Sequence, residues 1–252
     1  MKQTTVQAVL FTVIWFLIAT IFLWWSYIYF GGEILQWKSW NTNTNIQGQV
    51  AQTQPAIVKN NTLSQDSLEQ IIPEDVYILG NSDAEITWIE YSDLECPFCK
   101  KLHLAGTIDA VMKKYEGNVN FIFKHFPLDF HANAQKEAEA AECVGELAGG
   151  ELYYKFINTI FERTKGNGTG FALADLWPLA AELWVNQKEF QTCLDSGKYL
   201  QKVNDDMSEG KGFGITGTPG NVLINTKTGE WDKLPGAYPY ESFIAIIDSL
   251  LQ

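Results

Sequence analysis

Two cysteines, Cys96 and Cys99, frame the short stretch "CPFC", with Pro97 and Phe98 between them. Two thiols at this spacing can hold a metal ion, form a structural disulfide or exchange electrons with another dithiol. The chain has only four cysteines in 252 residues, too few for a small domain built on a disulfide framework. The surroundings of the pair must therefore decide between a metal site and redox chemistry.

A zinc site fits poorly with the other candidate ligands. A structural zinc site needs four ligands, usually two cysteine pairs or one pair with closely spaced histidines. The histidines of this chain, His103, His125 and His131, do not form such a unit. We expect them to pack in loops or on helix surfaces rather than to act in catalysis. A Cu(I) carrier needs only two thiolates, so it remains the non-enzymatic alternative.

The residues around the pair favour redox chemistry. Helical spacing begins directly after Pro97, and proline is common at the first position of a helix, which makes Cys96 the N-cap. A thiolate there faces free backbone N–H groups and the positive end of the helix dipole, which both lower its pKa. Cys99 lies one turn further on and faces inward. We therefore expect Cys96 to be the attacking thiol and Cys99 to be the resolving thiol.

The segments on either side predict an α/β domain. "DVYILG", "EITWIEY" and "NVNFIFKHF" are short and rich in β-branched and aromatic residues, as strands are. Apolar residues at helical spacing follow the second strand, in "CPFCKKLHLAGTIDAVMKKY". A block of helices follows at about residues 131–211, with glycine-containing breaks at 148–150, 166–170 and 196–197, and two strands and a helix complete the chain. A C-x-x-C motif at a strand-to-helix junction in a β-α-β pattern is typical of thioredoxin-like redox sites.

The N-terminal region predicts a membrane anchor. Residues 8–30 carry no charge, and a helix of this length, about 34 Å, can cross a hydrocarbon core of about 30 Å. No small-residue cleavage site follows, so we favour an uncleaved signal anchor over a cleaved signal peptide. Lys2 and the amino terminus precede the span, which places residues 1–7 in the cytoplasm and the rest of the chain outside it. Residues 31–72 are polar and predict a flexible tether to the domain at 73–252, with a short turn of helix near "SLEQII" at its end.

Four segments of this domain resemble a known family. "EYSDLECPFCK", "FKHFPLDFHANAQKEAEAAECVGE", "FQTCLDSGK" and "GFGITGTPG" are similar to the DsbA-like thioredoxin-fold oxidoreductases, especially the membrane-anchored bacterial kind. The resemblance covers about residues 74–250 and includes the helical block, which this family inserts into the thioredoxin fold. It implies a thioredoxin fold with an inserted helical domain, preceded in this chain by one N-terminal transmembrane helix.

The resemblance also implies roles for single residues. Cys96 and Cys99 match the redox-active pair. Pro219 matches a cis-proline that packs against the disulfide, and proline is the residue for which a cis peptide bond costs little. Thr218, which precedes it, would contact the sulfur atoms and the substrate. The two residues between the cysteines would support the same site.

Glu90 lies six residues before Cys96, where enzymes of this fold often carry a buried acid. The period of two along a strand places Trp88 and Glu90 on one face. A half-buried carboxylate with a raised pKa could pass a proton to and from Cys99. The alternative is an exposed acid at the end of a strand. We favour the catalytic role, because a carboxylate in an otherwise apolar strand is costly without a function.

The chain departs from the strongly oxidising members of the family at Phe98, where those enzymes have a histidine. Phenylalanine has no ring N–H group to stabilise a thiolate. Asp93 and Glu95 would oppose a thiolate at Cys96, whereas Lys100 and Lys101 would favour it. We therefore expect a less oxidising couple, with a reduction potential below about −120 mV.

Cys143 and Cys193 both lie in the predicted helical block. Thiols outside the cytoplasm tend to be oxidised, so a structural disulfide and two buried free thiols both remain open. A bridge requires the two Cα atoms to lie within about 7 Å of each other.

Together these features predict an extracytoplasmic thiol–disulfide oxidoreductase that introduces disulfides into protein substrates at Cys96 and Cys99. The scheme needs no cofactor, and the resemblance implies reoxidation by a quinone-linked thiol oxidase in the membrane. A protein disulfide isomerase or reductase is the alternative, although the short tether offers no dimerisation domain of the kind that isomerases use. The net charge of −12 argues against nucleic acid as a partner, because phosphate binding rests on Lys and Arg contacts.

Overall fold

The computed structural model describes residues 61–252 of the chain. The predicted cytoplasmic tail (1–7), the predicted membrane span (8–30) and most of the predicted tether (31–72) lie outside these residues. Within the described part, no helix combines the length and the apolar composition needed to cross a membrane. The domain that holds the four cysteines lies wholly within the described residues.

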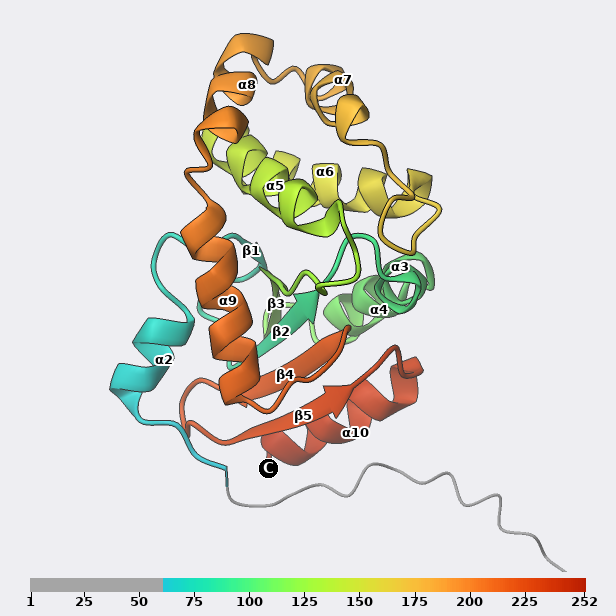
Figure 1. Ribbon diagram of the computed structural model, residues 1–252. Helices are drawn as coiled ribbons and strands as arrows, with labels where there is room; N and C mark the ends of the chain where they lie inside the picture. The colour runs from blue at the N-terminus through green and yellow to red at the C-terminus, as the bar shows by residue number, and fades with distance from the viewer. Residues whose placement is uncertain (1–60) are drawn as a thin grey trace, which may run out of the picture. The chain divides into compact units, whose positions relative to one another are not determined.

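A mixed five-stranded sheet forms the centre of this domain, in the strand order β1-β3-β2-β4-β5 (Figure 1). The strands are β1 (Ile78–Gly80), β2 (Ile86–Ser92), β3 (Val119–His125), β4 (Gly220–Asn225) and β5 (Trp231–Pro235). Strands β2 and β3 run parallel, and the other neighbouring pairs run antiparallel. Every residue of β2 and β3 is buried. The strand that leads to Cys96 is therefore enclosed on both faces and along both edges.

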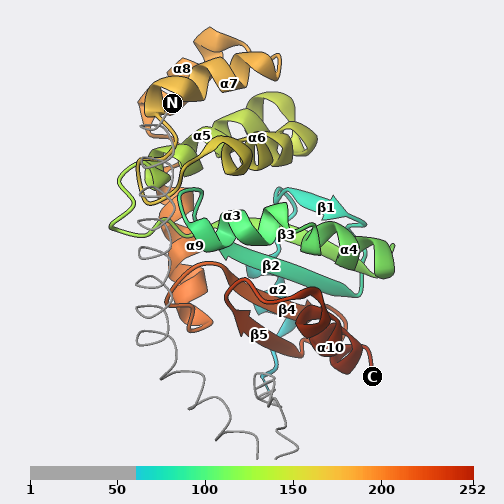
Figure 2. The same cartoon turned by 90° about the vertical axis from the view of Figure 1, so that its right-hand side faces the viewer.

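Helices cover the sheet and form a separate layer beside it (Figure 2). They are α2 (Gln65–Ile71), α3 (Pro97–Leu104), α4 (Thr107–Lys114), α5 (Ala134–Ala148), α6 (Gly150–Arg163), α7 (Leu176–Glu182), α8 (Gln187–Ser196), α9 (Leu200–Gly212) and α10 (Tyr240–Leu250), with a 3-10 turn at Leu173–Asp175. This order confirms the predicted succession of β-α-β, a block of helices and β-β-α.

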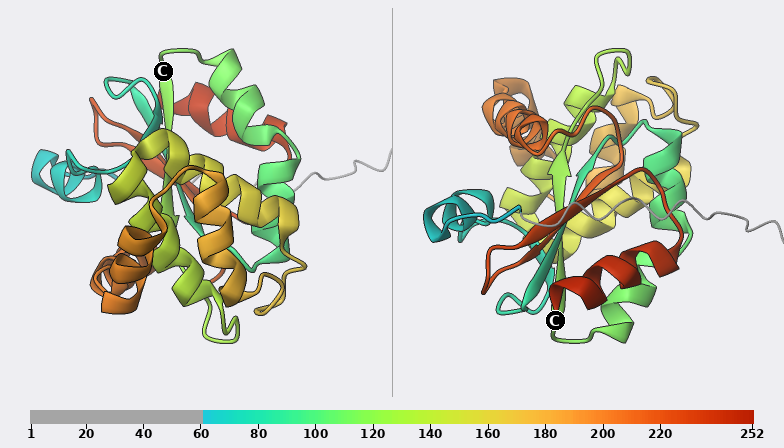
Figure 3. Two further views of the ribbon diagram at one scale, coloured as in Figure 1. Left: turned by 90° about the horizontal axis from the view of Figure 1, so that it is seen from above. Right: turned by 90° about the horizontal axis from the view of Figure 1, so that it is seen from below.

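The two faces of the sheet carry different helices (Figure 3). Trp88 of β2 faces the side of α4 and α10, and its ring lies 4.3 Å from the ring of Phe243. Ile89, the next residue, belongs to the apolar cluster on the opposite face, which includes Phe213 at the end of α9. Side chains of β2 therefore alternate between the faces, as the period of two predicts.

Helix α2 corrects the predicted extent of the tether, which was placed at residues 31–72. Leu68 and Ile71 are buried against the second face of the sheet. Lys124 Nζ also donates a hydrogen bond of 2.8 Å to the carbonyl oxygen of Ile71. Apolar residues at a spacing of three lie on one side of a helix, and their burial fixes this segment to the domain. The folded part therefore begins before residue 73.

The helical pattern that starts at Cys96 forms two helices rather than one. Helix α3 ends at Leu104, and α4 begins at Thr107. Gly106 between them has a φ of 69°, in the left-handed region that glycine adopts at little cost. Helix α3 can therefore end one turn after the cysteines, while α4 takes a separate course along β3.

Helices α5 to α8 form the inserted block, which lies above the sheet in Figure 1. Gly149 (φ of 86°) and Gly197 (φ of 65°) interrupt the chain after α5 and after α8, at two of the predicted breaks. The third predicted break, residues 166–170, lies in the loop between α6 and α7. Helix α9 then leaves the block and packs on β2 and β3. This return brings the chain back to β4, directly beside β2.

Candidate active site

Cys96 is the N-cap of α3, and Pro97 is the first residue of the helix. The Cys96 backbone is extended, with φ of −77° and ψ of 122°, as a residue just outside a helix requires. Both thiols are free, so the structure describes the reduced form of the pair. Cys96 is 4% exposed and Cys99 is fully buried, whereas Phe98 between them is 62% exposed. A partner can therefore reach Cys96 but not Cys99.

The two thiols differ in acidity for local reasons. A hydrogen bond from the Cys99 thiol lowers the pKa of Cys96 to about 6, with further hydrogen bonds from Thr218 and from backbone N–H groups of α3. These contacts outweigh the burial of Cys96. Burial raises the pKa of Cys99 well above its usual value, and the neighbouring Cys96 sulfur and the Glu90 carboxylate raise it further. At neutral pH the reduced pair therefore carries one thiolate, on Cys96, and one thiol, on Cys99.

The Thr218–Pro219 peptide bond, which the resemblance implied to be cis, is cis in the structure. The Cys96 thiol, when protonated, donates a hydrogen bond of 3.4 Å to the carbonyl oxygen of Thr218. The carbonyl oxygen of Pro219 accepts a hydrogen bond of 2.7 Å from Gly236 N–H. Strand β4 begins at the next residue and pairs with β2. The pairing of β2 with β4 thus brings the two ends of the predicted site together.

Glu90 is completely buried in the middle of β2. Its Oε1 accepts a hydrogen bond of 2.7 Å from the Ser92 hydroxyl, and its Oε2 lies 2.9 Å from Nε2 of His103. The negative charge of Glu90 acts on the Cys99 thiol. The alternative of an exposed acid at a strand end is therefore wrong, and the carboxyl group lies beside the inner cysteine.

His131 packs in the loop before α5, as predicted, whereas the predictions for the other two histidines are wrong, since His125 ends β3 and the His103 side chain faces inward from α3. Each histidine is buried or nearly so and pairs with a buried carboxyl group. The three pairs are His103–Glu90 at 2.9 Å, His125–Glu142 at 3.0 Å and His131–Asp93 at 2.8 Å. One sequence signal could have found the first pair. His103 follows Cys99 by four positions, and this spacing places both on the inward side of α3.

The charged residues next to Cys96 are bound elsewhere. The Glu95 carboxylate accepts hydrogen bonds from the backbone N–H groups of Gly168 (3.0 Å), Gly170 (2.6 Å) and Phe171 (2.8 Å). It also accepts a hydrogen bond of 2.8 Å from the Thr164 hydroxyl. Glu95 therefore attaches the loop after α6 to the start of α3, and its carboxylate is turned to that loop.

Asp93 and Lys100 are engaged in the same way. The Asp93 carboxylate accepts hydrogen bonds from Leu128 N–H at 2.7 Å and from Glu95 N–H at 2.8 Å, besides its contact with His131. Lys100 Nζ donates a hydrogen bond of 2.6 Å to the carbonyl oxygen of Thr164. Three of the four charged residues that the sequence weighed are therefore held by loop contacts, which sequence spacing does not reveal.

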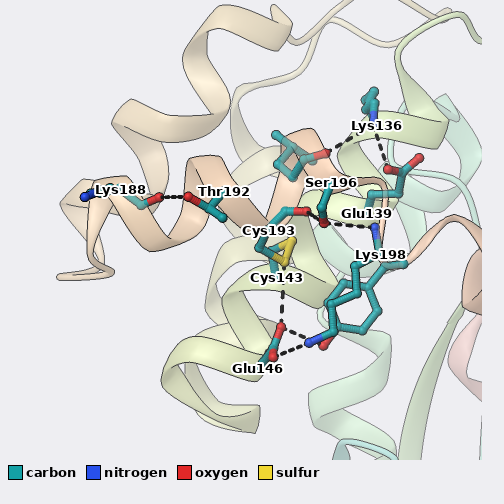
Figure 4. Close-up of a disulfide and its surroundings, with 11 residues drawn as sticks. Lys136, Glu139, Cys143, Glu146, Lys188, Thr192, Cys193, Ser196 and Lys198 are labelled. Atoms are coloured by element: carbon teal, nitrogen blue, oxygen red, sulfur yellow. Dashed lines mark hydrogen bonds and ion pairs between the residues drawn. A yellow bond between two sulfur atoms is a disulfide. The ribbon is translucent and has the colours of Figure 1, made fainter.

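Cys143 and Cys193 form a disulfide that joins α5 to α8 (Figure 4). Their Cα atoms lie 5.9 Å apart, within the range that a bridge requires. Beside the bridge, Glu146 of α5 forms an ion pair with Lys198 and accepts a hydrogen bond of 3.0 Å from the Tyr199 hydroxyl. The choice between a bridge and two free thiols is thus settled in favour of the bridge.

Within residues 61–252, no three side chains of the histidine, cysteine or acidic type come together as metal ligands. The chemistry that the site offers is that of the two free thiols, a buried carboxyl group and the backbone before Pro219.

The domain matches the family model described as "Thioredoxin" over residues 73–248. The chain belongs to this thioredoxin family. Among solved structures of the family, DsbA2 of Pseudomonas aeruginosa is 27% identical, with a TM-score of 0.60, and covers 69% of this chain and 93% of its own. Alpha-DsbA1 of Wolbachia pipientis is 27% identical, with a TM-score of 0.57, and covers 71% of this chain and 91% of its own. This thioredoxin-family chain is thus a thiol–disulfide oxidoreductase of the DsbA-like kind, as its motifs predicted.

Other matches are more limited. BdbD of Bacillus subtilis shares the fold, with a TM-score of 0.59 at 22% identity, and covers 71% of this chain and 94% of its own. The Na(+)/H(+) antiporter NhaA 1 of Mycolicibacterium gilvum is 29% identical over 168 residues, which make up 66% of this chain and 26% of the antiporter. NhaA 3 of Salinispora tropica is 34% identical over 185 residues, 73% of this chain and 26% of its own. This thioredoxin-family chain thus spans about a quarter of the length of these antiporters.

Proposed function

We propose that this oxidoreductase introduces disulfides into protein substrates outside the cytoplasm. The observation that carries the proposal is the difference between the two thiols, with the pKa of Cys96 lowered to about 6 and that of Cys99 raised. A stabilised thiolate at Cys96 favours the reduced pair over the disulfide, and an enzyme whose reduced form is stabilised is a better oxidant. The proposal is therefore that electrons flow from the substrate to this site.

The exchange would begin with the Cys96–Cys99 disulfide. A substrate thiolate attacks Cys96 Sγ, a bond forms between the two sulfurs, and Cys99 leaves as a thiolate that takes up a proton. A second substrate thiolate then attacks the substrate sulfur of the mixed disulfide and releases Cys96 as a thiolate. The substrate loses two electrons and gains a disulfide, and the enzyme pair is reduced.

The surrounding residues would serve these steps. Glu90 would hold and transfer the proton of Cys99, because it is the buried carboxyl group beside that thiol. Thr218 and Pro219 would receive the substrate backbone next to Cys96, to which Thr218 is already hydrogen-bonded. Phe98 would contact apolar side chains of the substrate, since it is largely exposed beside the reactive sulfur.

The proposed location rests on the sequence before the domain. The uncharged segment 8–30 would anchor the chain in the membrane, with Lys2 on the cytoplasmic side and the domain outside. The Cys143–Cys193 bridge supports this location, because stable disulfides are common outside the cytoplasm and rare inside it. A quinone-linked thiol oxidase in the same membrane would reoxidise Cys96 and Cys99. Ion transport is not part of the proposal, since the chain spans only a quarter of its antiporter relatives.

A test of the direction uses the full chain in detergent. The oxidised protein is mixed with a reduced, unfolded protein that needs disulfides, and separately with the same protein carrying scrambled disulfides. We expect net disulfide formation in the first mixture and little reshuffling in the second. Faster reshuffling than net oxidation would instead support an isomerase.

Partners can be captured at the same site. A Cys99→Ser variant lacks the resolving thiol, so we expect mixed disulfides between Cys96 and substrates to accumulate. A Cys96→Ser variant is the matched control and should capture nothing. Copper bound to the reduced wild-type protein at one ion per domain, without thiol exchange, would instead favour the Cu(I) carrier.

A further inference from the structure

A row of hydrogen-bonding groups leads from Cys99 to the protein surface. The Ser92 hydroxyl contacts the Cys99 sulfur and donates a hydrogen bond of 2.7 Å to Glu90 Oε1. Glu90 Oε2 lies 2.9 Å from His103 Nε2, and His103 Nδ1 lies 3.1 Å from Asn158 Oδ1. From Ser92 to Asn158 each member lies within hydrogen-bonding distance of the next, and the Ser92 hydroxyl also hydrogen-bonds the Cys99 sulfur.

The row runs from the interior to solvent. Glu90 is completely buried, and the His103 side chain is 5% exposed. Asn158 on α6 is exposed, and with His103 it lines a surface pocket of about 190 Å³. The imidazole ring packs on Phe161, with the ring centroids 4.4 Å apart, and edge-to-face with Phe123 at 5.7 Å. His103 is therefore the last titratable group between the buried carboxyl group and water.

The hydrogen-bond partners of His103 fix how many protons the pair holds. Asn158 Oδ1 can only accept, so His103 Nδ1 carries a proton. Nε2 then either accepts a hydrogen bond from a neutral Glu90 carboxyl group or, in the imidazolium, donates one to the Glu90 carboxylate. In both arrangements one additional proton lies between Glu90 and His103, close to Cys99.

We propose that His103 is a positioning residue that acts through Glu90 and carries the proton exchanged between Cys99 and solvent. The inference rests on the proposed exchange at Cys96 and Cys99 and specifies how Cys99, the buried thiol, gains and loses its proton. His103 touches neither the substrate nor the reacting sulfurs. It keeps a mobile proton on Glu90 and replaces that proton from the surface pocket.

In the direction of substrate oxidation, attack of the substrate thiolate on Cys96 breaks the Cys96–Cys99 bond, and Cys99 departs with the electron pair. The shared proton passes from Glu90 through the Ser92 hydroxyl to Cys99 Sγ, and His103 takes up a replacement proton from water. When the pair is reoxidised, Cys99 gives the proton back by the same route before it attacks.

Other ionisable groups lie near His103 on every element packed against it. Glu90 faces it from β2, and Cys99 and Lys100 share its own helix. Lys100 is turned away, because its Nζ binds the carbonyl oxygens of Glu162 and Thr164. The pocket beside His103 is also lined by ionisable residues from α4 and α6, namely Asp109, Tyr154 and Glu162.

The test compares two substitutions in the full chain, His103→Gln and His125→Gln. Glutamine can still form hydrogen bonds but cannot carry an additional proton. His125 is the matched control, since it forms the same kind of buried pair with Glu142 at 3.0 Å and has no place in the row. When the two variants lose similar stability, a difference between their rates of thiol exchange is due to the loss of His103 from the row of hydrogen-bonding groups.

The measurement separates the two cysteines. Reduced protein is mixed with excess oxidised glutathione, and the release of glutathione from the Cys96 mixed disulfide reports attack by Cys99. We expect His103→Gln to slow this release by about tenfold or more at pH 7, since general acid–base groups contribute factors of this size or larger. The pH profile of glutathione release in this variant should also move to higher pH. The rate at which iodoacetamide alkylates Cys96 in His103→Gln should stay close to that of the wild type. The rate of glutathione release in His125→Gln should also stay close to the wild-type rate.

Two further measurements guard against a merely structural effect. Imidazole added to a His103→Ala variant should restore part of the release rate, because the site opens on the surface pocket. In wild-type protein labelled with ¹⁵N-histidine, His103 should carry a proton on Nδ1 in both the oxidised and the reduced form, because the proton that passes to Cys99 is replaced from water. Unchanged release in a folded His103→Gln variant, or a His103 ring without a proton on Nδ1, would overturn the inference. Failure of wild-type protein to exchange disulfides at all would instead overturn the proposed function.

Discussion

The two cysteine pairs of this domain each contain a fully buried sulfur but differ in chemical state. Cys99 and Cys143 are each at most 1% exposed, yet the first belongs to a free pair and the second to a disulfide. Cys96 precedes a helix and receives hydrogen bonds from its backbone N–H groups. Cys143 and Cys193 lie inside α5 and α8, where the backbone N–H groups are used within the helices. Burial alone therefore does not decide whether a thiol is reactive.

The position in the chain decides what a bond between the sulfurs does. A bond between Cys96 and Cys99 closes one helical turn and can open without disturbing the fold. The bond between Cys143 and Cys193 spans 50 residues and holds two helices of the inserted block together. The first pair is thus placed for repeated exchange, and the second restrains the unfolded chain.

The largest expected contrast concerns activity. Cys96→Ala should reduce disulfide exchange to the uncatalysed rate, because the attacking sulfur is lost. The double variant Cys143→Ala/Cys193→Ala should retain most of the wild-type exchange. Both are measured by oxidation of a reduced substrate protein. A comparable loss in the double variant, in protein that still folds, would show that the second pair takes part in the reaction.

The second contrast concerns stability. Removal of the Cys143–Cys193 bridge should lower the free energy of unfolding by about 4 kcal/mol, the amount that loop-closure entropy predicts for a loop of this length. Reduction of Cys96–Cys99 in the intact protein should not cost a comparable amount, because that loop is short and the Cys96 thiolate is stabilised. Urea unfolding of the double variant and of the wild type in both redox forms gives the three values. Equal losses would remove the distinction between the pairs.

The third contrast concerns pH. The folded pKa of Cys96 is lowered from 9.0 to about 6. A lowered pKa contributes stability that is present above the unfolded value and is lost as the pH falls through the folded value. The stability of the reduced protein relative to the oxidised protein should therefore rise from about pH 6 to pH 9, and alkylation of Cys96 should have its midpoint near pH 6. A midpoint near 9, as in an ordinary thiol, would contradict this.

The smallest expected effect concerns Phe98. Phe98→His would place a ring N–H group beside the Cys96 thiolate and stabilise the reduced pair, so the reduction potential should rise by about 30 mV or more. Leu200→His, at a position 47% exposed on α9, is the matched control and should leave the potential unchanged. Both are measured by equilibration with glutathione. A wild-type potential already near −120 mV would sink the expectation of a weaker oxidant.

The sequence was informative where local rules apply. Pro97 marked the start of α3 and therefore the special position of Cys96. The period of two along β2 placed Glu90 on the same face as Trp88, which is the buried face towards Cys99. These inferences needed only the neighbours of each residue in the chain.

The sequence was less informative where residues distant in the chain meet. Glu95 binds backbone groups of the loop at 168–171, more than 70 positions away, and no spacing rule connects the two. His103 was misjudged because its partner Glu90 lies on another element, which α3 meets only after folding. Helix α2 was assigned to the tether because its two buried residues become buried only by packing against the sheet, which the local sequence does not reveal.

The Cys143–Cys193 bridge has a consequence for how the protein is made. A newly synthesised chain carries reduced thiols at both pairs, so its own maturation includes a thiol oxidation of the type that the mature site is proposed to perform. A producing cell must supply that first disulfide from another source, or from copies of the protein already completed. The yield of fully bridged protein should therefore depend on the oxidising capacity of the host compartment as well as on the folding of the domain.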